Sequence, residues 1–453
     1  MTLPTWSALV AAADPALVLP SGERRAEVDV PGPLALDGLL DLGEGHAVAV
    51  VRSADTARWT VPLVRDGDAG ARLRRSRPGD GTAERLVRAF ARGGIDPGGR
   101  FVAEVFGERE RLEGERGITV DQTNESVIVG ERAVVKWAVR LPAEGEPGSP
   151  AAQRIAALAR AGFADMPEPR GLLTLANDEE RPVLLASVVA YLPGAEDGWE
   201  WAVDDVRRLA RGELSLDGAL APAQRLGELT ARMHAALATC GRTPASAAAV
   251  AAWGDRMRAE LDEAVALVPG AEGARLAAWA PRIADAYAEL ADGALAGTPL
   301  IDVHGDFHVG QVLRVGHSSK VGHHLRAQER YAVVDFDGNP VLPAEQRAAR
   351  QPAALDVVGM AASLDHVGRV VLFRTPEVDP APVRAWIAAA QRAFLDAYRA
   401  TLAASGAGDL LDERLAVPLR LAQEVREYLY AVRHLPHWVY VPDLSLADLL
   451  PEN

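Results

Sequence analysis

The stretch HGDFHVGQVLR at residues 304–314 and the stretch AVVDFDGNP at residues 332–340 decide the fold of this 453-residue chain. The first stretch follows an apolar run and places Asp306 five residues ahead of the amide side chain of Gln311. The second stretch places two carboxylates at the end of another apolar run. Taken singly, each cluster is compatible with a capped turn or a hairpin tip. Their order, at a separation of about thirty residues, indicates one shared site.

The spacing of these groups is typical of phosphoryl transfer, in which a protein positions an acceptor hydroxyl and neutralises phosphate charge. Asp306 fits the Asp of an H-x-D-x-x-x-x-N pattern and is predicted to be the catalytic base that accepts the hydroxyl proton. Gln311 occupies the amide position of that pattern, and Asp335 occupies the position of a D-F-G aspartate. Because Mg²⁺ prefers oxygen ligands, Gln311 and Asp335 are the predicted metal ligands.

Composition limits the classes of protein to which the chain can belong. Hydrophobic residues make up 49% and charged residues 25%, which predicts a globular protein of two or three domains. The net charge of −15 disfavours a nucleic acid or an anionic membrane as the main partner. Cys240 is the single cysteine and no signal peptide is recognisable, so a cytoplasmic protein is expected. The oligomeric state stays open.

The pattern of short runs divides the chain into three predicted parts. Residues 1–93 alternate apolar runs with turn residues and are expected to form a mostly β N-terminal cap subdomain of unknown role. Residues 94–190 are expected to form a kinase-like N-lobe, with a helix at 151–161 in the place of the kinase αC helix. Residues 191–453 read as long helices and are expected to form a helical C-lobe that carries the catalytic and acceptor sites.

The predicted nucleotide site lies in the N-lobe. Lys136, one of two lysines in the chain, follows a strand–turn–strand pattern and is expected to bind the nucleotide phosphates. A surface lysine on an edge strand is the alternative. Gln122 and Ser126 lie in the turn region that would cover the phosphates. An apolar strand ends near Val189 and Tyr191, where the interlobe hinge is expected to bind adenine through its backbone.

The helix predicted at about residues 418–433 carries an apolar stripe and a separate polar stripe. A solvent-exposed helix face with i,i+4 pairs is the alternative, purely structural explanation of the polar stripe. We predict instead that it lines the acceptor site, where carboxylates and amides would bind sugar hydroxyls and a protonated amine. The predicted substrate contacts, which include two groups outside this helix, are His304, Arg420, Gln423, Glu424, Glu427 and Trp438.

These motifs resemble the maltokinase-like branch of the aminoglycoside phosphotransferase group. The resemblance covers most of the chain and rests above all on the H-G-D-F-H-x-G-Q-V-L run at residues 304–313, the D-G-W at 197–199 and the D-Q-T-N-x-S at 121–126. It implies an α+β, bilobal protein-kinase-like fold, with a small β-rich N-lobe that carries the cap and a large helical C-lobe. It also implies an enzyme that uses ATP and Mg²⁺.

The acceptor region departs from the maltokinase pattern. Asp337 and Asn339 stand where maltokinases carry glutamates in D-F-E-G-E-P, and the C-terminal helix differs as well. In these places the chain resembles actinobacterial glucosamine kinases, which implies transfer of the γ-phosphate of ATP to the 6-hydroxyl of glucosamine. A maltokinase and an aminoglycoside phosphotransferase are the alternatives among enzymes. A pseudokinase that serves as a binding module is the alternative outside them. The insert at 317–330 has no assigned role.

Overall fold

The computed structural model describes residues 4–20, 33–66, 72–93, 95, 99–107, 110–118, 125–176, 182–290, 295–316 and 329–451. The predicted contact Gln122 and most of the insert at 317–330 lie outside the described residues. The chain forms two compact units. Unit 1 comprises residues 1–159, 167–193 and 340–348, and unit 2 comprises residues 160–166, 194–339 and 349–453. The division at residues 93 and 190 stays a prediction.

The first sheet of unit 1 is a strongly apolar meander of antiparallel strands. Its central strand β2 is buried over nearly its whole length, as its run of valines and alanines predicts. Helices α1 (Trp6–Ala12) and α2 (Pro15–Val18) pack on the sheet, and α4 (Thr82–Arg92) follows it. The strands in spatial order are β1 (Ala35–Gly43), β2 (His46–Arg52), β3 (Arg58–Asp66) and β4 (Arg72–Arg75), with the short β9 (Arg140–Leu141) also on β3.

In the second sheet of unit 1, the strands do not lie in the order in which they follow one another in the chain, and every neighbouring pair is antiparallel. Its apolar face packs with α4 in one buried cluster that includes Leu86, Phe90 and Trp137. The strands in spatial order are β5 (Phe101–Val105), β10 (Pro169–Leu175), β11 (Val183–Ala190), β8 (Ala133–Trp137), β7 (Glu125–Val129) and β6 (Glu115–Gly117). Helix α5 (Ala151–Arg160) confirms the helix expected at the αC position.

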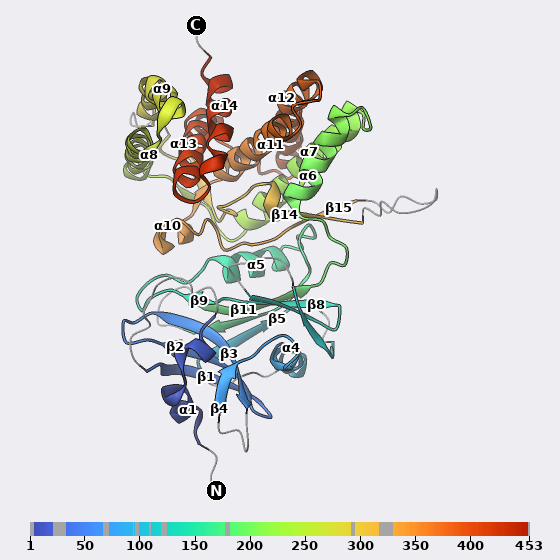
Figure 1. Ribbon diagram of the computed structural model, residues 1–453, viewed down its shortest axis with the longest axis vertical. Coiled ribbons are helices and arrows are strands. Elements are labelled where there is room, and N and C mark those ends of the chain that lie inside the picture. The colour runs from blue at the N-terminus through green and yellow to red at the C-terminus, as the bar shows by residue number, and fades with distance from the viewer. Residues whose placement is uncertain are drawn as a thin grey trace. The chain divides into compact units, whose positions relative to one another are not determined.

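Unit 2 is built mainly from long helices, together with the β14–β15 hairpin and a small three-stranded sheet of β12, β13 and β16 (Figure 1). One buried cluster joins α8 and α9 to α11, α13 and α14, and α7 packs along α12. The helices are α6 (Gly198–Ala210), α7 (Leu216–Ala238), α8 (Ala247–Leu267), α9 (Gly270–Ala288), α11 (Ala354–Arg374), α12 (Pro380–Ala404), α13 (Ala416–His434) and α14 (Tyr440–Leu449), and the shorter α10 (Ala344–Ala348) belongs to unit 1. The small strands are β12 (Thr243–Pro244), β13 (Pro299–Ile301), β14 (Val312–Val315), β15 (Arg330–Val333) and β16 (Gln351–Pro352).

The contact between α7 and α12 depends on a glycine. A Cβ atom at Gly227 would lie 2.2 Å from the Phe394 carbonyl oxygen, so a larger residue would force the helices apart. Both helices have clear start signals. The Ser215 hydroxyl accepts the Gly218 N–H at the beginning of α7, and Asp379 caps α12 just before Pro380.

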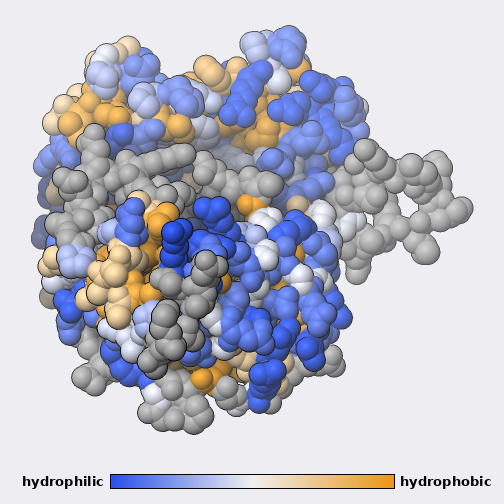
Figure 2. Space-filling view, turned by 60° about the horizontal axis from the view of Figure 1, so that its bottom comes forward, coloured by the Kyte–Doolittle hydropathy of each residue, from blue (hydrophilic) through white to orange (hydrophobic). Residues whose placement is uncertain are grey.

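A β-rich unit and a helical unit confirm the predicted α+β, kinase-like fold class. Within the described ranges, no helix combines the length and the apolarity that a membrane span requires. Hydrophilic side chains cover much of the face drawn in Figure 2, with small hydrophobic patches between them, as the charged fraction of 25% leads one to expect.

Candidate active site

The predicted catalytic base lies on a tight turn that its neighbours hold in place. Gly305 adopts a φ of 82°, in the left-handed region that favours glycine, and directs the chain into Asp306. His304 is fully buried, and its Nε2 donates to the Val334 carbonyl oxygen at 2.9 Å while its Nδ1 accepts the Asp306 N–H at 3.4 Å. His304 therefore ties the turn to the end of β15. Its predicted contact with substrate stays a prediction.

A buried carboxylate on α11 braces the same turn. The two oxygens of Asp356 accept the N–H of His304 at 2.7 Å and that of Gly305 at 2.9 Å. His234 of α7 bonds to Asp356 through Nε2 at 3.1 Å and to the Tyr398 hydroxyl through Nδ1 at 2.8 Å. Burial alone would raise the pKa of Asp356, but the His234 hydrogen bond and charge outweigh it and lower that pKa. Asp356 thus stays ionised under the catalytic turn.

The backbone of Gln311 lies close to that of Asp335 at the open end of the β14–β15 hairpin. The Gln311 carbonyl oxygen accepts the Val334 N–H at 2.9 Å, which brings Gln311 beside the residue that precedes Asp335. Asp335 has a φ of 64°, a conformation that costs a non-glycine residue free energy. Such strain concentrates at functional sites, and here it falls on a residue chosen from the sequence for its chemistry.

The electrostatic environment of Asp306 fits a general base. Its burial, followed by the negative charges of Asp335, Glu427 and Asp356, raises the pKa of Asp306 to about 7, while the Arg426 charge opposes the rise. A base works best when its pKa lies near the working pH. Glu427, from the predicted acceptor stripe, therefore lies near enough to Asp306 for its charge to raise the pKa of that carboxyl.

Helix α6 begins against the catalytic loop at the D-G-W motif. The Asp197 side chain accepts the Trp199 N–H at 2.9 Å and caps the helix. A Cβ atom at Gly198 would lie 1.7 Å from the Val309 carbonyl oxygen, so only glycine lets the helix and loop meet. Arg314 lies on β14, the strand that follows the loop. It donates hydrogen bonds to Glu196, which precedes α6, and to Asp205 within α6.

An aromatic group lies beside the catalytic loop. The Trp199 ring centroid is 6.0 Å from that of Trp438, in an edge-on arrangement, and 6.5 Å from that of His308. Burial lowers the pKa of His308 to about 4, with a further contribution from His304 and His366, so this ring is neutral at physiological pH. The predicted sugar contact Trp438 therefore stands in one cluster with the loop that carries Asp306.

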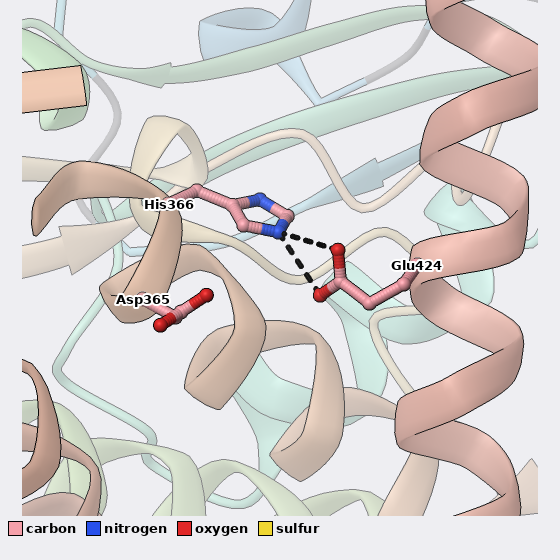
Figure 3. A group of neighbouring side chains, drawn as sticks. All are labelled: Asp365, His366 and Glu424. Atoms are coloured by element: carbon pink, nitrogen blue, oxygen red, sulfur yellow. Dashed lines mark hydrogen bonds and ion pairs between the residues drawn. The ribbon is translucent and has the colours of Figure 1, made fainter. Parts of the chain in front are cut away.

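The polar stripe of α13 is partly internal. Glu424 is fully buried, accepts hydrogen bonds from Arg420 and His366, and belongs to the group drawn in Figure 3. Burial would raise the pKa of Glu424, but the charges of Arg420 and His366 outweigh it and lower that pKa. Burial likewise opposes the charge of His366, yet Glu424 raises the His366 pKa. Arg420 and Glu424 thus form a buried ion pair as well as being predicted substrate contacts.

Asp365, His366 and Glu424 place one ligand atom each within 4.8 Å of one another, which is close enough to hold a metal ion. Two guanidinium groups already occupy the carboxylates. Arg369 bonds to Asp365 at 2.7 and 2.9 Å, and Arg420 bonds to both Asp365 and Glu424. A divalent cation would meet two fixed positive charges here. We therefore assign these side chains to a buried charge network that links α11 to α13.

The rest of the stripe is more accessible. The Gln423 amide donates to Glu427 at 3.1 Å and accepts from Arg426 at 2.9 Å. Arg426 also lies 3.9 Å from Glu260 of α8. Among the predicted acceptor residues on α13, Glu427 has a charge that raises the pKa of the Asp306 carboxyl.

Two of the predicted nucleotide residues of unit 1, Ser126 and Lys136, lie in one row across the second sheet. Ser126 of β7 pairs with Lys136 of β8, which in turn pairs with Ser187 of β11. Directly paired residues of antiparallel strands project to the same face. Ser126 and Lys136 therefore share one face, although the sequence alone placed them only near the same turn.

The predicted hinge also lies in unit 1. Val189 pairs with Val134 at the end of β11, and the Tyr191 N–H donates to the Arg132 carbonyl oxygen at 2.9 Å. Because this N–H is engaged, any adenine contact of Tyr191 uses its carbonyl oxygen or its ring. Arg116 of β6 donates to the Tyr191 hydroxyl at 3.1 Å and lies 5.4 Å from the ring centroid.

Comparisons with known proteins place this geometry in a family. The chain is 79% identical over 450 residues to a glucosamine kinase from Streptacidiphilus jiangxiensis, and the match covers 99% of each sequence. The chain belongs to the glucosamine kinase family. A glucosamine kinase from Mycolicibacterium smegmatis is 41% identical over 415 residues, which cover 91% of this chain and 98% of the relative. No protein-family model matches the sequence.

Solved glucosamine kinases share the fold. One crystal form superimposes with a TM-score of 0.89 at 76% identity over 99% of this chain and 100% of the other. A glucosamine kinase in complex with glucosamine, ADP and inorganic phosphate matches with a TM-score of 0.87 at 75% identity over 99% and 100% of the two chains. The resemblance to this kinase branch that the motifs predicted is confirmed.

Sequence reasoning did not find all the groups that shape this glucosamine kinase site. His234 and Asp356 brace the catalytic turn, yet neither is among the site residues that the sequence predicts. Trp199 belongs to the D-G-W motif but was given no role at the site. Tyr398 and Arg426 were given none either, and nothing in their local sequence pattern distinguishes them from ordinary helix residues.

Proposed function

We propose that this protein is an ATP-dependent kinase that transfers the γ-phosphate of ATP to the 6-hydroxyl of glucosamine and yields glucosamine 6-phosphate. The observation that carries the proposal is the position of Asp306 on a turn that Asp356 holds, with the carboxylates of Asp335 and Glu427 near enough to raise its pKa. An acidic surrounding of this kind complements the ammonium group of an amino sugar. The solved relative in complex with glucosamine, ADP and inorganic phosphate supports the same substrates for this chain.

Asp306 would accept the proton of the acceptor hydroxyl as that oxygen attacks the γ-phosphorus. Asp356 would keep the turn in place, because it holds the two N–H groups that precede Asp306. Glu427, Gln423 and Trp438 are the proposed sugar contacts, and Arg420 and Glu424 would hold α13 in position behind them. His304 is proposed to act mainly by orienting the turn.

The residues at the end of the β14–β15 hairpin fit Mg²⁺. Gln311 and Asp335 supply an amide oxygen and a carboxylate, which are ligand types that Mg²⁺ prefers, and Asp335 is held in a strained conformation at this point. When bound, the metal would neutralise charge on the phosphates of ATP. Lys136 and Ser126 are the proposed phosphate contacts of unit 1, with Gln122, and Val189 and Tyr191 are the proposed adenine contacts.

A cytoplasmic location is part of the proposal, because ATP is the phosphoryl donor and the single cysteine excludes an intrachain disulfide. Glucosamine and ATP are the proposed small-molecule partners.

A coupled assay of ADP formation with glucosamine, glucose, maltose and an aminoglycoside tests the proposal. Glucosamine should give the highest kcat/KM, and Asp306→Asn should lower kcat by about 10² to 10⁴. Maltose as the best acceptor would instead favour the maltokinase alternative, and an unchanged kcat in Asp306→Asn would favour the binding module.

A further inference from the structure

The N-terminal cap has no role in the proposed reaction, yet it holds the strand that leads into the nucleotide region. Strand β6 is only three residues long and precedes β7, which carries Ser126. On both sides of the intervening residues 119–124, which lie outside the described ranges, a glutamate bonds to the cap.

The first of these contacts replaces the missing cap of a helix. Helix α4 begins at Thr82, and the residue before it, Gly81, has a φ of 95° and no side chain to cap the first N–H groups of the helix. The Glu115 carboxylate accepts the N–H of Gly79 at 3.0 Å, of Gly81 at 2.9 Å and of Glu84 at 2.7 Å. An anion at a helix N-terminus is stabilised by these N–H groups and by the helix dipole.

The contact is reciprocal. Glu84, in the first turn of α4, accepts the Gly114 N–H at 2.9 Å, so each segment satisfies a backbone donor of the other. In an ordinary capping box the two side chains belong to one helix. Here the box is divided between α4 and β6, and it fixes the strand against the helix. Arg88 holds Glu84 in turn.

The second contact lies on the far side of residues 119–124. Arg75 of β4 is buried and donates through Nε and Nη2 to one oxygen of Glu125 at 2.8 and 2.5 Å. Glu125 immediately precedes Ser126, whose partner across the sheet is Lys136. A shift of Glu125 would therefore move Ser126 along the strand that faces Lys136.

We propose that the cap positions the nucleotide-binding strands of this kinase through the Glu115 and Glu125 contacts, so that these two glutamates are positioning residues for ATP. The inference rests on the proposed function, in that Ser126 and Lys136 bind the phosphates. It assigns to the cap a role in nucleotide affinity rather than in acceptor choice.

The test measures nucleotide affinity with and without turnover. Glu115→Gln and Glu125→Gln should each raise the KM for ATP and the Kd for ADP, measured by titration calorimetry with Mg²⁺, by roughly three- to tenfold. The KM for glucosamine and kcat at saturating ATP should stay within about twofold of wild type. Val10→Ala, in the cap core on α1, is the matched control, since it lowers stability without touching β6 or β7.

Equal KM values for ATP in Glu115→Gln, Glu125→Gln and Val10→Ala would overturn the proposal, because a merely structural role predicts a loss of Tm alone. Arg75→Gln breaks the Arg75–Glu125 contact from the other side, so it tests the contact even if a glutamate variant does not fold. Because both residues act through this one contact, the double variant Arg75→Gln/Glu125→Gln should weaken ADP binding no more than either single change. Additive losses would also overturn the proposal. The calorimetric arm needs no acceptor, so a wild-type protein that binds ADP but does not phosphorylate glucosamine would refute the proposed function and leave this inference standing on its own result.

Discussion

Asp306 is surrounded by more negative than positive charge. Its burial and the carboxylates of Asp335, Glu427 and Asp356 hold its pKa at about 7, against an ordinary value of 3.8. Between these two values the folded protein binds a proton that the unfolded chain has released, so this group lowers stability as the pH rises towards 7. The chain keeps an unfavourable charge at the point where a base is needed.

This arrangement predicts an acid limb in the activity profile. Because the base must be deprotonated, kcat/KM for glucosamine should fall as the pH drops through the pKa of Asp306, which Mg²⁺ bound at Asp335 would bring below 7 in the working enzyme. Glu427→Gln removes one of the carboxylates that raise the pKa, so its limb should move to lower pH. Profiles of both proteins over about pH 5 to 9 provide the measurement. The sugar amine titrates equally in both, so the difference between the profiles reports on Asp306, and coincident limbs would contradict the assignment.

At the residue scale, what the sequence could predict was local. Asp306 and Gln311 lie on one loop, and their separation of five positions is visible in the sequence. The partnership of Asp356 with His234 spans 122 positions, and that of His234 with Tyr398 spans 164. Which of many helix histidines and aspartates meet in the core depends on how the helices pack, and a single sequence does not specify it.

At the scale of elements, α11 and α13 are joined by the buried charge network around Glu424. Removing one member of a buried pair leaves the other charge uncompensated, which costs more than the pair contributes. Glu424→Gln should therefore lower the free energy of unfolding by about 3 to 5 kcal/mol. Denaturation in urea gives this quantity.

Glu263 supplies the matched control, since its pair with Arg433 also involves α13 but is 46% exposed on each side. Glu263→Gln should change the free energy of unfolding by less than about 1 kcal/mol. A chelator should leave the Tm of the ligand-free wild type unchanged, because the guanidinium groups of Arg369 and Arg420 fill the place that a cation would take. Equal losses in the two variants, or a fall in Tm with the chelator, would refute the network.

Helix α6 is a second element whose position is set by one residue. Gly198→Ala would place a Cβ atom 1.7 Å from the Val309 carbonyl oxygen and push the catalytic loop away from the helix. We expect a loss of about 1 to 3 kcal/mol in stability together with a fall in kcat. Gly254→Ala on α8 is the control, since the nearest atom to its Cβ would be 3.4 Å away, and it should be neutral or stabilising. The measurements are kcat and the free energy of unfolding in urea for both variants. A fully active Gly198→Ala would contradict the close approach of α6 to the Val309 carbonyl group.

The sequence pattern of α13 shows why an element can be predicted while its environment cannot. The polar stripe was correctly placed on one side of a helix, and α13 spans Ala416–His434. Periodicity states which residues share a face, but not whether water, substrate or another helix covers that face. The structure places Glu424 among buried charges and Glu427 near Asp306, two environments within one stripe.

At the scale of the whole molecule, the resemblance of the motifs implied the kinase-like class, and the local patterns agree with it because each unit follows its own pattern. Unit 1 reads as short apolar strands and unit 2 as long helices, and each has its own buried cluster. The role of the cap was not predictable, since Glu115 is one glutamate among 63 acidic residues and its three N–H donors lie more than thirty positions upstream.

Separate cores predict separate unfolding steps. A chain whose two units have separate buried clusters need not unfold in one transition, so calorimetry should resolve two. The proposed sugar contacts all belong to unit 2, and a ligand stabilises the part that binds it. Glucosamine at about 100 times its Kd should therefore stabilise one transition by about 2.7 kcal/mol and leave the other nearly unchanged. Val10→Ala should lower only the transition that glucosamine does not move, because Val10 lies in a core of unit 1. A single transition that responds to both glucosamine and Val10→Ala would mean that the two units unfold as one.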